Sequence, residues 1–115
     1  MCRAHDVFLI CDEVATGFGR TGTMFACEQE DVAPDILCLG KGISGGYLPP
    51  AAAPATQAVY ERVLRNGDEL QNFFPRPTHT GHPPGCAAAI ATPDRVGGGR
   101  GLARGAERRG EVRSV

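Results

Sequence analysis

VFLICDEVATGFGRTG, residues 7–22, carries the strongest indication of the fold in this chain. The apolar run from Val7 to Cys11 is typical of a strand buried on both faces of a parallel sheet, because its apolar side chains point in both directions. Asp12 and Glu13 end the run, and a glycine-rich loop follows them. This order predicts a buried strand that delivers acidic side chains to a loop at one edge of a sheet.

A second apolar run, residues 36–39, is followed at once by Gly-Lys-Gly at residues 40–42. Residues 24–28, between the two runs, favour a short helix or turn. Two short apolar strands joined by a crossover indicate an α/β fold with a parallel sheet. In such sheets functional groups collect at the carboxyl ends of neighbouring strands. We therefore expect Asp12 and Lys41 at the same edge of the sheet.

The next segments follow the same pattern less regularly. A third strand would cover residues 51–56, but Pro50 and Pro54 interrupt it because proline lacks the N–H that a strand ladder needs. Thr56 can cap a helix that follows it. The alanine-rich residues 85–91 predict another helix.

Charge and composition exclude several classes of protein. Twelve basic residues against 13 acidic ones give a net charge of −1, which does not predict a nucleic-acid binder. No apolar run approaches the roughly 20 residues of a membrane span, and we expect no secretory signal. The scattered cysteines contain no CxxC pair, so they predict neither a zinc site nor a disulfide framework and fit a reducing cytoplasm. They are Cys2, Cys11, Cys27, Cys38 and Cys86.

Lys41 is the only lysine, and arginine cannot replace an amine that must deprotonate. Three interpretations of Asp12 and Lys41 compete. In an ATPase, Asp12 would end a Walker B strand and Lys41 would belong to a phosphate loop. That loop requires Gly at position 35 and Ser or Thr at position 42, but the chain has Asp35 and Gly42. As structural residues, Asp12 would cap a turn and Lys41 would be solvated. As a pyridoxal-phosphate pair, Lys41 would form a Schiff base and Asp12 would face the pyridine nitrogen.

Residues 10–22 resemble the signature of class III (subgroup II) pyridoxal-phosphate aminotransferases. Residues 25–28 and 34–49 are similar, more narrowly, to the branch that transfers an amino group from S-adenosylmethionine to 8-amino-7-oxononanoate in biotin biosynthesis. The resemblance covers about residues 2–91. It implies α/β structure, as part of the large domain of a fold-type I transferase, with a mostly parallel sheet and flanking helices. Two alternatives stay open: a class III aminotransferase for ω-amino acids, diamines or lysine, and an inactive truncated fragment.

The resemblance also implies roles for individual residues. Lys41 is the Schiff-base lysine and proton shuttle, and Asp12 is the carboxylate on the pyridine nitrogen. Thr78 reaches the cofactor phosphate of the neighbouring subunit, and Pro77 supplies adjoining backbone. The resemblance therefore implies a homodimer that takes a small-molecule amino donor and a keto acceptor.

Two arginines and two histidines stand near these positions. Arg20 would hold a substrate carboxylate bidentately or donate to nearby backbone carbonyls. Arg76 stands where the family usually has a glycine that lies against the substrate, so it would crowd or recharge the pocket. His79 and His82 lie three residues apart in a loop without a third ligand, which does not predict a metal site.

Residues 92–115 differ in composition from the rest. They contain Pro93, six glycines and six arginines, and too few large apolar residues to offset the entropy of ordering. We expect a partial cofactor-binding large domain over residues 1–91, and a tail over residues 92–115 that is a degraded helix or disordered. Counterparts of the family's N-terminal phosphate-binding part and C-terminal domain are missing, so we expect a fragment that is inactive alone.

Overall fold

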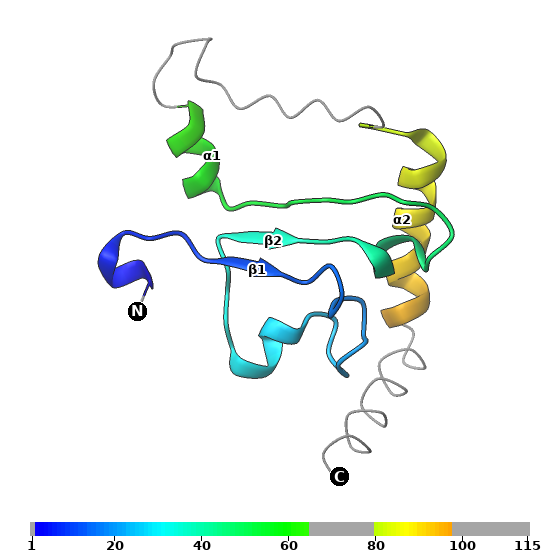
Figure 1. The fold of residues 1–115 in the computed structure, drawn as a ribbon, viewed down its shortest axis with the longest axis horizontal. Coiled ribbons are helices and arrows are strands. Elements are labelled where there is room, and N and C mark those ends of the chain that lie inside the picture. The colour runs from blue at the N-terminus through cyan, green and yellow to red at the C-terminus, as the bar shows by residue number, and fades with distance from the viewer. Residues whose placement is uncertain (1, 65–79, 98–115) are drawn as a thin grey trace, which may run out of the picture.

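The computed structural model describes residues 2–64 and 80–97. Two short parallel strands lie at the centre, with turns and two helices around them (Figure 1). The expectations for Arg76, Pro77, Thr78 and His79 fall outside the described residues. In chain order the elements are η1 (Cys2–His5), β1 (Ile10–Asp12), η2 (Ala26–Glu30), β2 (Ile36–Cys38), η3 (Lys41–Ser44), α1 (Gln57–Leu64) and α2 (Pro83–Gly97).

Strands β1 and β2 pair in parallel, which confirms the expected sheet. The register sets Ile10 beside Ile36 and Asp12 beside Cys38. The crossover between them contains the 3₁₀ helix η2 rather than a full α-helix. Both strands therefore end at the same edge, and the loops that follow them meet there.

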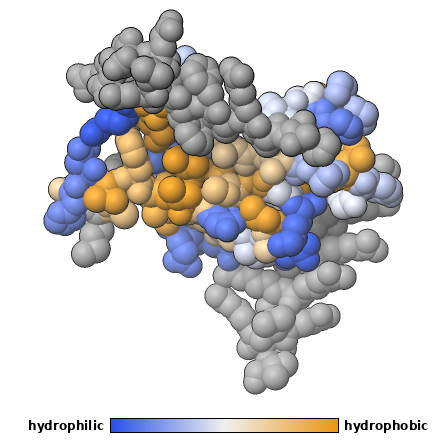
Figure 2. All heavy atoms as spheres, turned by 45° about the horizontal axis from the view of Figure 1, so that its top comes forward, coloured by the Kyte–Doolittle hydropathy of each residue, from blue (hydrophilic) through white to orange (hydrophobic). Residues whose placement is uncertain are grey.

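The expected burial of the first strand on both faces is wrong for this chain. Ile10 is 58% exposed, whereas Cys11 on the opposite face is half-buried. The physical reason is that α2 packs chiefly against η3 and leaves one face of β1 uncovered. Among the described residues no apolar side chain is fully buried, and Figure 2 shows apolar atoms spread over one face of the molecule.

Residues 51–56 run antiparallel to β2 but form only two isolated bridges, at Leu39–Ala52 and Ile36–Ala55. The Leu37 N–H donates to the Pro54 carbonyl at 3.0 Å. In this register the N–H of residue 54 would return a bond to the Leu37 carbonyl, but proline has none. The interruption of the third strand by Pro54 is therefore confirmed, with its cause.

Helix α2 covers the alanine-rich segment, as expected, and continues through Pro93 to Gly97. The Thr92 hydroxyl donates to the Ala88 carbonyl at 3.0 Å in the turn before that proline. The helix thus passes the boundary expected at residue 91, and residues 98–115 lie outside the described part. No helix in the described ranges has the length and apolar character to cross a membrane.

Candidate active site

Asp12 is the last residue of β1, and its side chain is exposed. Its carboxylate Oδ1 accepts a hydrogen bond from the Val14 N–H at 3.0 Å. This contact holds the carboxylate at the turn that leaves the strand. Because side chains alternate along a strand, Asp12 shares the exposed face with Ile10, while Cys11 and Glu13 lie on the opposite face.

Lys41 begins η3, three residues beyond the strand residue that pairs with Asp12. Its side chain is exposed and forms no salt bridge or side-chain hydrogen bond with any residue in the described ranges. The Ile43 N–H donates to the Gly40 carbonyl and the Gly45 N–H to the Gly42 carbonyl, which shapes the turn around the lysine. Asp12 and Lys41 therefore follow neighbouring strands at one edge, as the sequence predicts.

The turn that carries Lys41 lies directly on the loop that follows Asp12. A Cβ on Gly40 would lie 3.0 Å from the Val14 side chain, and one on Gly42 would lie 2.8 Å from Phe18. Phe18 itself packs edge-to-face on Phe25, with ring centroids 5.9 Å apart. A side chain at position 42 would therefore force the loop or the turn to shift, whereas one at position 40 would be a tight fit against Val14.

Glu13 is the least expected residue of the site, because its side chain is only 3% exposed. Its carboxylate accepts hydrogen bonds from the Thr16 hydroxyl and from the Cys27 N–H, the latter at 2.8 Å. In the sequence, Glu13 is only an acid that ends the apolar run. No local signal predicts its burial, because the Cys27 N–H that bonds to it comes from a segment 14 residues further along the chain.

Electrostatics support an ionised Glu13. Burial by itself disfavours the charged form, but the hydrogen bonds from Thr16 and from the backbone at Cys27 and Ala26 outweigh it. Together they lower the pKa of Glu13 below its ordinary value. Burial, followed by the nearby Glu13 carboxylate, raises the pKa of the Cys27 thiol. Cys27 is therefore a neutral donor toward this carboxylate rather than a reactive thiolate.

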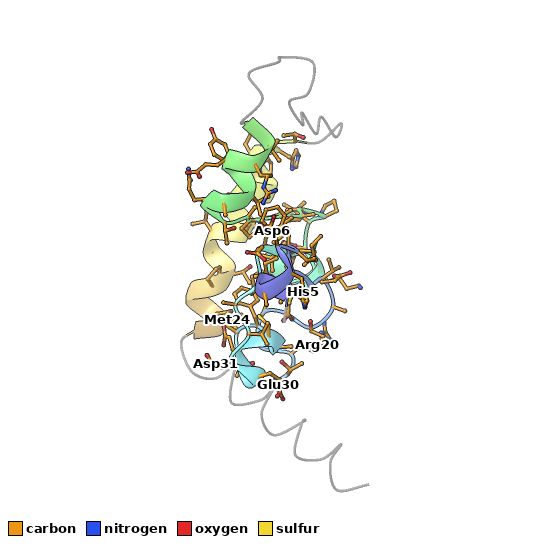
Figure 3. The ribbon with its side chains drawn as sticks, turned by 90° about the vertical axis from the view of Figure 1, so that its left-hand side faces the viewer. His5, Asp6, Arg20, Met24, Glu30 and Asp31 are labelled. Atoms are coloured by element: carbon orange, nitrogen blue, oxygen red, sulfur yellow. The ribbon has the colours of Figure 1, made fainter. Side chains whose placement is uncertain are left out.

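Arg20 lies in the loop after β1, and Figure 3 shows it in the same part of the molecule as Met24 and as Glu30 and Asp31 at the end of η2. Its side chain is exposed and forms no salt bridge with any residue that the structure describes. Nor does its guanidinium donate a hydrogen bond to a backbone carbonyl within the described ranges, so the backbone-donor alternative is not observed there.

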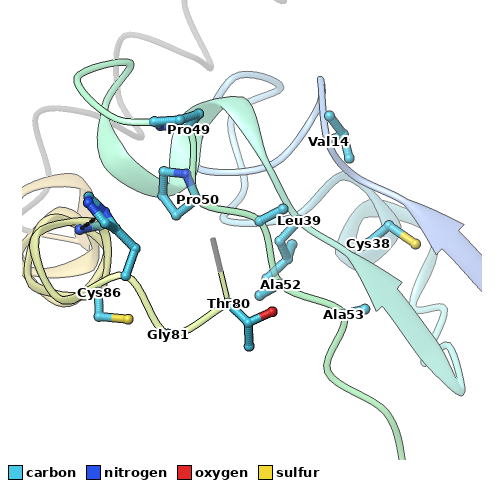
Figure 4. Close-up of a pocket in the computed structure, with 13 residues that line it drawn as sticks. Val14, Cys38, Leu39, Pro49, Pro50, Ala52, Ala53, Thr80, Gly81 and Cys86 are labelled. Carbon is cyan, nitrogen blue, oxygen red and sulfur yellow. Dashed lines mark hydrogen bonds between the residues drawn. The ribbon is translucent and has the colours of Figure 1, made fainter. Parts of the chain in front are cut away.

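A cavity of about 760 Å³ lies between the end of β2, the proline-rich segment after η3 and the start of α2 (Figure 4). Most of its wall is apolar, and Thr80, His82 and Cys86 are among the lining residues that bring polar atoms to it. Neither Asp12 nor Lys41 belongs to its lining, so the cavity is separate from the strand ends that carry these two residues. His82 is held by the chain itself, since its Nδ1 accepts the Gly85 N–H at 3.2 Å. Within the described residues no cluster of three potential metal ligands occurs.

Comparison with known proteins adds a family to this geometry. The sequence model of the family described as aminotransferase class III matches residues 1–111. An adenosylmethionine-8-amino-7-oxononanoate aminotransferase of Nitratidesulfovibrio vulgaris is 53% identical over 94 residues, which are 82% of this chain and 17% of the relative.

Solved structures show the same likeness. An aminotransferase of the same name from Methanocaldococcus jannaschii has a TM-score of 0.78 at 44% identity, and the match covers 90% of this chain and 24% of that chain. An amine transaminase from an uncultivated Pseudomonas species, in its PLP-bound form, has a TM-score of 0.77 at 42% identity over 84% of this chain and 22% of that one. The α/β fold of a fold-type I transferase is thereby confirmed, and the chain spans about a fifth of the length of these relatives.

Proposed function

This chain belongs to the class III aminotransferase family, and we propose that it carries the cofactor lysine and the ring-nitrogen carboxylate of a pyridoxal-phosphate-dependent aminotransferase. The observation that carries the proposal is the position of Lys41. The only lysine of the chain stands on the turn after β2, beside the strand end that bears Asp12. Neither the phosphate-loop interpretation nor a solvated loop lysine explains why this one amine persists among eleven arginines.

The donor set fits pyridoxal phosphate. An exposed amine and an exposed carboxylate lie at neighbouring strand ends, and neither takes part in a salt bridge with a described residue. Such a pair is free to engage an aldehyde and a protonated pyridine at once. When bound, pyridoxal phosphate supplies that aldehyde and a ring that takes up the electron pair left at the substrate Cα.

Lys41 and Asp12 then have distinct tasks. The Nζ of Lys41 would accept the proton that leaves the substrate Cα and would deliver it to the cofactor carbon that had carried the aldehyde. The Asp12 carboxylate would accept a hydrogen bond from the protonated ring nitrogen and so stabilise its charge. The Val14 N–H, which already holds Asp12 Oδ1, leaves the second carboxylate oxygen available for this bond.

Four further residues complete the proposed site. Thr78, with adjoining backbone from Pro77, binds the cofactor phosphate of a neighbouring subunit, so the active form is a homodimer. Arg20 binds a substrate carboxylate, for which its exposed guanidinium is available. Arg76 lies at the substrate side of the pocket and narrows it or changes its charge.

We assign the substrates from the named relatives. The donor is S-adenosylmethionine and the acceptor is 8-amino-7-oxononanoate, in biotin biosynthesis in the cytoplasm, which accords with the relative at 53% identity. The second candidate is an amine transaminase, favoured by the Pseudomonas likeness at 42% identity. Since the chain spans about a fifth of these relatives, we propose that it has no transaminase activity by itself.

Labelling with the cofactor tests the proposed role of Lys41. The chain is incubated with pyridoxal phosphate at pH 7.5, reduced with borohydride and mapped by peptide mass spectrometry. The α-amino group of Met1 is an internal reference, because its ordinary pKa of about 8 makes it far more reactive than an unassisted lysine with a pKa of about 10.4. We expect the adduct mainly on Lys41. The same chain in urea is the control, and an equal Lys41-to-Met1 ratio with and without urea would contradict the proposal.

A second assay separates the two candidate activities. The full coding frame that contains this chain is expressed, and amino transfer is measured from S-adenosylmethionine to 8-amino-7-oxononanoate and from a simple arylalkylamine to pyruvate. We expect turnover of the first pair only. Turnover of the amine and pyruvate alone would establish the second candidate in its place.

A further inference from the structure

Glu13 connects several segments around the proposed site. Its backbone N–H donates to the Cys38 carbonyl at the end of β2, and its carbonyl accepts the Gly17 N–H, both at 2.9 Å. Its side-chain carboxylate accepts hydrogen bonds from the Thr16 hydroxyl and the Cys27 N–H. One residue thus ties together the end of β2, the loop after β1 and the start of η2.

The loop that Glu13 closes supports the turn formed by residues 40–45, which we call the lysine turn. Val14 packs closely against Gly40, and Phe18 lies so near Gly42 that a Cβ there would clash with it. Phe18 has a φ of 60°, in the left-handed region that is costly for a bulky residue. Such a conformation persists only when surrounding contacts enforce it. The contacts that hold this segment are the Phe18–Phe25 ring contact, the bond from the Gly19 N–H to the Met24 carbonyl, and the hydrogen bonds of Glu13 to residues 16 and 17.

Glu13 and Asp12 lie on opposite faces of the same strand end. The exposed face presents Asp12, while the other face buries the Glu13 carboxylate beneath η2. Glu13 is therefore shielded from any ligand at the Asp12 side, which excludes direct contact with substrate. Its effect on the site has to pass through the loop.

We propose that Glu13 is a positioning residue that holds the loop beneath Gly40 and Gly42, and so sets where Lys41 stands relative to Asp12. The role of Lys41 and Asp12 in this inference rests on the proposed function. The effect of Glu13 on the position of the loop does not depend on a bound cofactor. The important property of Glu13 is its capacity to accept hydrogen bonds at a fixed place. Glutamine preserves most of that capacity, since its Oε1 can accept the Cys27 N–H and its amide can donate to the Thr16 oxygen.

Amide hydrogen exchange of the full chain, without cofactor, tests the structural part. The variants are Glu13→Ala, Glu13→Gln and, as a matched control, Glu30→Ala, which removes an exposed acid from η2. The reporting amides are those of Ile43 and Gly45 in the lysine turn. We expect Glu13→Ala to speed their exchange by about tenfold or more, with Glu13→Gln and Glu30→Ala close to the unmodified chain.

The amides of Val59 and Tyr60 in α1 distinguish positioning from a general loss of stability. Both donate to the Thr56 carbonyl, in an element that Glu13 does not contact. If Glu13 acts by positioning the loop, Glu13→Ala speeds amide exchange in the lysine turn and leaves exchange in α1 unchanged. An equal rise in α1 and in the lysine turn, or unchanged exchange at Ile43 and Gly45 in Glu13→Ala, would overturn the inference.

The labelling ratio adds a readout at the reactive atom. Glu13→Ala should lower the Lys41-to-Met1 ratio toward that of the urea-treated chain, and Glu13→Gln should restore it. If the unmodified chain already labels Lys41 no better than in urea, the proposed function fails while the exchange experiment still judges Glu13. If the unmodified chain prefers Lys41 and Glu13→Ala keeps that preference, the inference about Glu13 fails alone.

Discussion

Single residues of this chain combine a reactive group with an unusually tight local environment. Lys41 is exposed, but Gly42 beside it has no room for a side chain and Gly40 packs closely against Val14. Asp12 is exposed, and the next residue, Glu13, is the most deeply buried acid among the described residues. The amine and the carboxylate that we propose for the cofactor are therefore flanked by closely packed neighbours.

Gly42→Ala should disturb the site without touching its chemistry. The new Cβ would lie 2.8 Å from Phe18, so the loop or the turn must shift, at a cost of about 1–3 kcal/mol. We expect a lower urea midpoint and a lower Lys41-to-Met1 labelling ratio. The control is the double variant Gly42→Ala, Phe18→Ala, which removes the opposing ring and should recover part of the ratio. No recovery would show that Phe18 is not the obstacle.

The titration of Glu13 should appear as a pH dependence of stability. Its pKa is lowered in the folded chain, so its hydrogen bonds contribute fully above the ordinary value near 4.5 and are lost as the pH falls through the lower folded value. The difference in urea midpoint between the unmodified chain and Glu13→Gln should therefore shrink on acidification from pH 6 to pH 3. A difference that stays constant over this range would show that the charge of Glu13 contributes nothing.

At the scale of elements, the third strand of the sheet is incomplete because one backbone N–H is missing at Pro54. Residues 51–56 already follow β2 with the correct register, because Ala52 and Leu39 exchange two hydrogen bonds and Thr56 bonds to the Asp35 carbonyl. Pro54 stands where the ladder needs an N–H. The third strand is thus complete in direction and register but not in hydrogen bonds.

Pro54→Val should convert the isolated bridges into a continuous strand. The new N–H can bond to the Leu37 carbonyl, a gain of about 0.5–1.5 kcal/mol that the added freedom of the unfolded chain partly offsets. We expect a protected amide at residue 54 in hydrogen exchange and a slightly higher urea midpoint. Ala53→Val is the matched control, because it adds a β-branched side chain without adding a donor. An equal rise in urea midpoint in the two variants would mean that the β propensity of valine, and not the new hydrogen bond, stabilises the strand.

At the scale of the whole molecule, the described residues lack a buried apolar core. Val7, Ile10, Tyr60 and Ile90 are all more than half exposed. Exposed apolar area of this kind marks a surface that another segment or molecule covers. In the relatives the matched region is about a fifth of the chain, so most of their sequence lies outside the part compared here.

The isolated chain should therefore show the solution behaviour of a loosely packed protein. We expect strong binding of the dye ANS, a broad urea transition with a low slope, and association that increases with concentration. Fluorescence titration, urea unfolding followed by circular dichroism, and sedimentation velocity measure the three properties. A single sharp transition of a monomer without dye binding would contradict this prediction.

The sequence by itself was sufficient for the parallel pairing of two strands, for the common edge of Asp12 and Lys41, and for the break at Pro54. These features follow from local rules, because alternation, strand polarity and the missing proline N–H are properties of neighbouring residues. It was not sufficient for burial: β1 is exposed on one face, and Glu13, an acid at a strand end, is buried. Only the tertiary structure determined these, since η2 brings the Cys27 N–H to the Glu13 carboxylate and the lysine turn brings Gly42 onto Phe18. Burial depends on which distant segments meet, and that information lies in three-dimensional packing rather than in the spacing of residues.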